Sequence, residues 1–70
     1  MQEIHLTLKA ARVNRGLTQQ QASSKLGVSP DVISNWERCK SFPRALMIKE
    51  IEKLYKIPYN QIIFLPNKSD

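Results

Sequence analysis

Cysteine, glycine and long apolar runs are all scarce in this chain of 70 residues. The one cysteine, Cys39, has no partner for an internal disulfide, and with the one histidine, His5, it cannot supply the four ligands of a structural zinc site. No apolar run reaches the ~20 residues of a membrane span, and no signal-peptide core follows the N-terminus. We therefore expect a single small domain, residues 1–70, that is soluble, cytoplasmic and free of metal and cofactor.

Acidic residues are also few. Eleven Lys and Arg stand against six Asp and Glu, which gives a net charge of +5, and most of the excess precedes residue 45. A basic balance favours a polyanionic partner, either nucleic acid or an anionic membrane face. An enzyme is the weakest class, because His5 stands alone, Cys39 has no histidine at a local spacing, and there is no glycine-rich phosphate loop.

Turn and cap signals divide the chain into short helices. Gly16 and Gly27 are helix stops, Thr18 with Gln21 has the spacing of a capping box, and Ser29-Pro30 is a helix start. Apolar residues at helical spacing between these signals predict five helices, over residues 6–15, 18–26, 29–38, 44–55 and 59–63. No segment alternates as a strand would. The expected fold class is all-α, with a core over residues 6–65 and a polar tail over 66–70.

The second and third helices are joined by Gly27-Val28-Ser29 alone. So short a turn makes the two helices cross at about 90–120°, as in a helix-turn-helix unit. Such a crossing needs small residues on the first helix and branched apolar residues on the second. Ala22 and Ser23, then Ile33 with Trp36, meet these needs in order, so the sequence predicts a helix-turn-helix with Trp36 as a core anchor.

Three runs resemble the Cro/repressor helix-turn-helix family of compact phage and bacterial regulators: Leu17-Thr18-Gln19, Leu26-Gly27-Val28-Ser29 and Ile33-Ser34-Asn35-Trp36-Glu37. The likeness extends over about residues 8–63 and is strongest to short regulators of phages and prophages of Gram-positive bacteria. It implies a five-helix, lambda-repressor-like domain that binds double-stranded operator DNA. It leaves no room for a separate ligand-sensing domain, so no small-molecule ligand and no membrane partner are expected.

The resemblance implies that the third helix reads the major groove, as it does in this family. The base-reading positions are Ser29, Pro30, Asp31, Val32, Ser34 and Asn35. Asn35 is the strongest of these, since its amide can bond adenine through two atoms. Asp31 is also a favourable charge at a helix start, and Val32 is also suited to local packing.

Phosphate contacts are implied at Gln19, Arg12, Arg38, Lys40, Ser41 and Arg44. Such contacts position a protein on DNA without reading its sequence. For Arg12 the favoured reading is a structural ion pair with Glu37. Cys39 departs from the family, which has glycine at this left-handed position, and Pro30 with Asp31 replaces longer hydrogen-bonding residues.

The C-terminal end carries more apolar residues than one face of a short helix can bury. A self-association or partner-binding surface is therefore expected at Tyr59, Ile63, Phe64 and Leu65. A homodimer would join two reading helices on one operator. The alternative function is a modulator or anti-repressor that binds another phage repressor and has little DNA affinity of its own.

Overall fold

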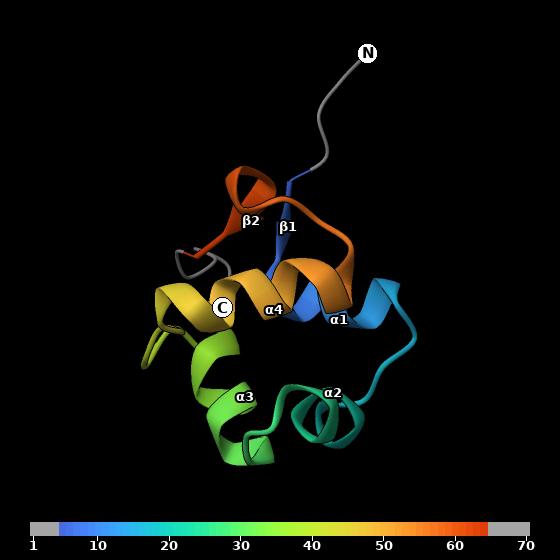
Figure 1. Ribbon diagram of the computed structural model, residues 1–70, viewed down its shortest axis with the longest axis vertical. Helices are drawn as coiled ribbons and strands as arrows, with labels where there is room; N and C mark the ends of the chain where they lie inside the picture. The colour runs from blue at the N-terminus through green and yellow to red at the C-terminus, as the bar shows by residue number, and fades with distance from the viewer. Residues whose placement is uncertain (1–4, 65–70) are drawn as a thin grey trace.

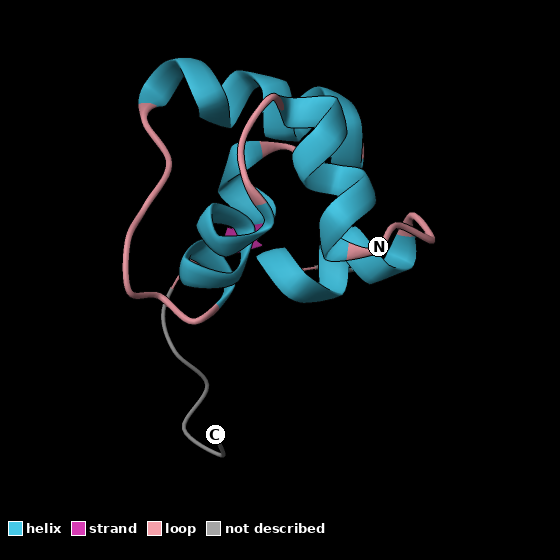
Figure 2. Cartoon of the chain, turned by 90° about the horizontal axis from the view of Figure 1, so that it is seen from below, coloured by secondary structure: helices cyan, strands magenta, loops and turns pink. Residues whose placement is uncertain are grey.

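The computed structural model describes residues 5–64, and helices make up most of this part of the chain (Figure 2). The elements in chain order are β1 (Leu6–Thr7), α1 (Leu8–Asn14), α2 (Gln19–Leu26), α3 (Pro30–Glu37), α4 (Ala45–Tyr55), the 3-10 turn η1 (Tyr59–Gln61) and β2 (Ile62–Ile63). Figure 1 shows α2 and α3 at one end of the molecule and the two strands at the other, with α1 and α4 between them. Within residues 5–64, no helix is long and apolar enough to cross a membrane.

The helix boundaries follow the predicted cap signals. The Thr18 hydroxyl accepts the N–H of Gln21 at 3.0 Å, and the Gln21 side chain accepts the N–H of Thr18 at 2.9 Å, which completes the capping box of α2. Gly27 ends α2 with φ 73°, and the Ser29 hydroxyl caps α3 by accepting the N–H of Val32 at 3.3 Å. Local sequence therefore determines the turn that separates α2 from α3.

At the two ends of the chain the structure differs in detail from the expected helices. The first helix does not start at residue 6, because the Thr7 side chain caps α1 by accepting the N–H of Ala10, which leaves Leu6 and Thr7 extended. The last expected helix is a single 3-10 turn, because Ile62 and Ile63 pair in parallel with Leu6 and Thr7. The described chain therefore has four α-helices and a two-stranded sheet, so it is not strictly all-α.

The core draws on all four α-helices and on β2, whereas β1 and η1 contribute no fully buried residue. The helix-turn-helix crossing supplies Ala22 and Ile33, which are 0% and 1% exposed, and the strand pair supplies Ile62. The hydrophobic core cluster within residues 5–64 is Leu8, Ala11, Ala22, Ile33, Trp36, Ile51, Tyr55, Ile57 and Ile62. Leu65 and the polar tail over residues 66–70, for which the sequence made expectations, lie outside the described residues.

Cys39 occupies the left-handed position at the end of α3, with φ 60°. Its N–H bonds the Trp36 carbonyl at 3.1 Å, and the N–H of Lys40 bonds the Asn35 carbonyl at 2.9 Å. This pair of hydrogen bonds is the Schellman motif that glycine usually closes. The chain therefore keeps the turn despite the non-glycine residue, and the Cys39 thiol donates a hydrogen bond to the Phe64 carbonyl at 3.2 Å.

Candidate nucleic-acid interface

The start of α3 is exposed and is held by its back face against α2. Ile33 and Trp36 are buried, whereas Ser29, Pro30 and Asp31 in the first turn are exposed. Asp31 lies in the first turn of α3, where its negative charge stabilises the positive end of the helix. This structural role explains Asp31 without any ligand. The buried side chains Ile33 and Trp36 thus hold α3 in place while its first turn stays accessible to solvent.

The remaining expected reading positions are half-buried. Val32 packs against the core, which supports local packing as its main role. Ser34 and Asn35 are partly accessible, and the Asn35 side-chain oxygen accepts a hydrogen bond from Arg38 at 3.5 Å. A contact that long at the surface is weak. The Asn35 amide is therefore free to bond another partner at little cost.

A basic loop follows α3 directly. Its side chains Arg38, Lys40, Ser41 and Arg44 are all exposed, and no acidic residue stands between Glu37 and Ala45. Three cations in a short loop create a positive surface beside α3. All four expected phosphate-contacting residues of this loop are thus accessible to an anion.

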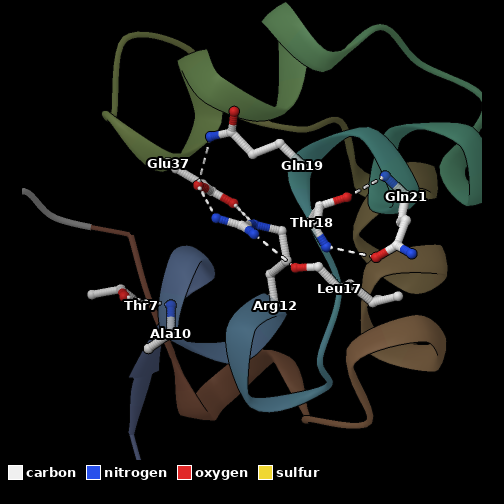
Figure 3. Close-up of polar contacts among 8 residues, drawn as sticks. All are labelled: Thr7, Ala10, Arg12, Leu17, Thr18, Gln19, Gln21 and Glu37. Atoms are coloured by element: carbon white, nitrogen blue, oxygen red, sulfur yellow. Dashed lines mark hydrogen bonds and ion pairs between the residues drawn. The ribbon is translucent and has the colours of Figure 1, made fainter.

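Arg12 has a different environment from the loop cations. Its Nε donates to Glu37 Oε2 at 2.6 Å, its Nη2 to Glu37 Oε1 at 3.2 Å, and its Nη1 to the Leu17 carbonyl at 2.7 Å (Figure 3). The hydrogen bond with Glu37 raises the pKa of Arg12. The structural ion pair is therefore confirmed. With only 9% of its side chain exposed, Arg12 offers little surface to a phosphate.

Gln19 joins the same network, a link that the sequence reasoning missed. Its Nε2 donates to Glu37 Oε1 at 3.0 Å, so that one carboxylate holds side chains from α1 and α2. No periodicity or spacing signals this contact, because it depends on the crossing angle of α2 and α3. Tyr55 packs close to the pair, and burial raises its pKa to about 12.

A second exposed surface is apolar. Tyr59 and Ile63 are 53% and 40% exposed, and the ring of Phe64 contacts that of Tyr59 in a tilted arrangement, with ring centroids 5.5 Å apart. An open groove of about 240 Å³ is lined by Phe42, Pro43, Ile48, Tyr59 and Phe64. Phe42 was missed by the sequence reasoning, although an aromatic residue in a polar connector was a usable signal. This apolar surface is not remote from α3, because the Phe64 carbonyl contacts Cys39.

Among residues 5–64, no three His, Cys, Asp or Glu side chains lie close enough together to hold a metal ion.

Comparison with known proteins agrees with this architecture. A family model described as helix-turn-helix matches residues 8–62. The HTH-type transcriptional activator BcrR of Enterococcus faecalis is 31% identical over 61 residues, which cover 87% of this chain and 30% of that protein. The chain therefore spans less than a third of the length of this relative. The match over residues 8–62 includes all four α-helices and the crossing of α2 and α3, and the chain belongs to the helix-turn-helix family.

Proposed function

We propose that this protein is a transcription regulator that binds duplex DNA in a sequence-selective way, with the first turns of α3 in the major groove. Family membership and the transcriptional role named for the Enterococcus relative support this function. In this reading Asn35 is the main base contact, assisted by Ser34 and by Ser29, Pro30 and Asp31 of the exposed first turn. Val32 contributes packing and, at most, contact with a thymine methyl group.

The observation that carries the proposal is the basic loop after α3. Arg38, Lys40, Ser41 and Arg44 are exposed next to the helix that would read the bases. Phosphates flank the major groove, so side chains that bond phosphate oxygens are expected beside a reading helix. Gln19, at the start of α2, adds an uncharged phosphate donor, and its hydrogen bond to Glu37 places it near the end of α3 that the basic loop follows. A helix-turn-helix with such a basic border fits a groove better than a protein surface.

We further propose that two copies bind one operator. The pairing surface consists of Tyr59, Ile63 and Phe64, with Leu65 next in the sequence. In such a dimer the two reading helices lie about 34 Å apart, which is one turn of B-DNA. Both half-sites are then bound at once, so a longer DNA site is recognised.

The apolar groove also favours a second candidate function. Phe42 is 58% exposed beside Tyr59, an arrangement suited to an apolar segment of another regulator. The chain would then modulate a repressor by binding it. Mobility-shift assays on promoter DNA, with and without the repressor, separate the two functions, since a modulator alters the repressor's shift but produces none itself.

The central test compares Asn35→Ala with Lys40→Ala on the best site selected from a random duplex pool and on unrelated DNA. Asn35→Ala is expected to reduce discrimination between the two by ~1–3 kcal/mol, because it removes a bidentate base contact. Lys40→Ala is expected to weaken both equally and to lower the slope of log K against log salt by about one.

Lys49→Ala provides the matched control, because Lys49 is an exposed lysine on α4 outside the basic loop. It should change neither the affinity ratio nor the salt slope. An unchanged ratio in Asn35→Ala would show that α3 does not read bases through this residue.

A further inference from the structure

One buried carboxylate connects three helices at the edge of the DNA-binding surface. Glu37, the last residue of α3, has only 4% of its side chain exposed. It accepts two hydrogen bonds from Arg12 of α1 and one from Gln19, the first residue of α2. Figure 3 shows the Gln19 amide with its nitrogen toward Glu37 and its oxygen pointing away. The orientation of a residue expected to touch DNA thus depends on a residue that is itself buried.

The chemistry of the two groups explains this orientation. An ionised carboxylate only accepts hydrogen bonds, so it must face the NH2 end of an amide. The amide nitrogen carries two hydrogens, and Glu37 takes one. Within residues 5–64, the Gln19 nitrogen has no acceptor besides Glu37, which leaves its second hydrogen available.

A DNA phosphate, like a carboxylate, only accepts hydrogen bonds. Only the NH2 end of Gln19 can therefore bond it, and an amide that rotates freely would present its oxygen part of the time. The charge of Glu37 would by itself repel a phosphate. Arg12 removes this repulsion, since its guanidinium lies 2.6 Å from the carboxylate and balances the charge.

We propose that Glu37 is a positioning residue for DNA binding, whose carboxylate holds the Gln19 amide with its second N–H ready for a backbone phosphate. The inference rests on the proposed DNA-binding function and assigns a role to Glu37 within it. Arg12 acts as the neutralising partner and does not touch the DNA. The side chain of Gln19 is then ordered before binding, so less freedom is lost when the complex forms.

The test is a double-mutant cycle on a mixed-sequence duplex with the variants Gln19→Ala, Glu37→Gln and both together. Gln19→Ala should weaken binding roughly three- to tenfold in the wild-type background, the effect of one ordered side chain. In the Glu37→Gln background the same change should cost less than twofold, because glutamine also accepts a flipped amide. Equal losses in both backgrounds would overturn the proposal. Gln20→Ala, an exposed glutamine in the same helix, is the control and should have little effect.

Glu37→Gln leaves Arg12 without its carboxylate and can unfold the chain, so a second measurement uses the wild type. In 15N-edited NMR spectra of the free protein, one side-chain proton of Gln19 should be shifted and exchange slowly, unlike either proton of Gln20. Added duplex should then shift the other Gln19 proton. Gln19 protons that match those of Gln20 in the free protein, or a second proton that DNA leaves unmoved, would overturn the proposal.

Lys40→Ala, measured on the same duplex, separates this inference from the proposed function. If Lys40→Ala weakens binding but the effects of Gln19→Ala and Glu37→Gln simply add, only the positioning role of Glu37 is contradicted. Absence of duplex binding by the wild type contradicts both.

Discussion

Cys39 and Lys56 have positive backbone φ angles, 60° and 55°. Among residues 5–64, they are the non-glycine residues with positive φ. Both end helices, α3 and α4, where a left-handed residue reverses the backbone. A side chain with a Cβ atom is crowded against the backbone there, at a cost of roughly 1–2 kcal/mol. Sequence reasoning located the first of these sites from the family's glycine, whereas nothing around Lys56 marked the second.

Cys39→Gly is therefore expected to stabilise the protein by about 1 kcal/mol, because glycine adopts this conformation without crowding. The lost thiol bond to the Phe64 carbonyl is weak and offsets only part of this gain. For a domain of this size the midpoint of thermal unfolding should rise by roughly 4–8 °C. Arg38→Gly, one residue earlier at φ −92°, is the comparison and should not raise the midpoint. A lower midpoint for Cys39→Gly would show that the thiol contact outweighs the backbone effect.

At the scale of elements, the start of α3 is set by its own sequence, whereas its position is set by the side chains that pack against its buried face. Ser29 and Pro30 specify the first turn, and the Ile33 side chain is buried against the core. These local signals made the four α-helices, the α2–α3 crossing and the exposed loop cations predictable. The parallel pairing of Leu6 with Ile62 and the bond from Gln19 to Glu37 were not, because each joins residues that only the complete fold brings together.

Truncation of Trp36 tests how strongly α3 relies on its back face. Trp36 is 8% exposed and belongs to the core. Trp36→Ala should cost ~3–5 kcal/mol, because it removes a large buried side chain and leaves a cavity. The total stability of a chain this short is on the order of 5 kcal/mol, so the variant should be largely unfolded at 37 °C. Circular dichroism against temperature measures this. Val13→Ala, which alters a residue 57% exposed on α1, should melt near the wild type. A wild-type midpoint for Trp36→Ala would mean that Trp36 is peripheral to stability.

On the scale of the whole molecule, two surfaces lie close together. The basic loop over residues 38–44 carries cations on its exposed side, and its Phe42 and Pro43 line the apolar groove together with Tyr59 and Phe64. The loop that carries the proposed DNA contacts therefore borders the proposed pairing surface. Anything that occupies the groove is expected to affect how firmly that loop can hold DNA.

Ile63→Asp tests the pairing surface. Ile63 is 40% exposed, so a charge is tolerated in the free chain but would be desolvated at an apolar interface. The variant is expected to sediment as a monomer at concentrations where the wild type assembles, with its helix content unchanged. Val13→Asp places the same charge outside this surface and should assemble normally. A wild type that is monomeric at high micromolar concentration both alone and on operator DNA would rule out the dimer.

The strand pair described above also has a consequence for the order of folding. Leu6 pairs with Ile62, so almost the whole described chain must be looped out to bring these residues together. Closing so long a loop in a disordered chain costs roughly 3–4 kcal/mol, which the few hydrogen bonds of two-residue strands cannot offset. The strands must therefore pair after the helices have already brought the ends together. Since Ile63 is part of β2, the proposed pairing surface forms only once the chain has folded, and a partly folded chain would not enter the proposed dimer.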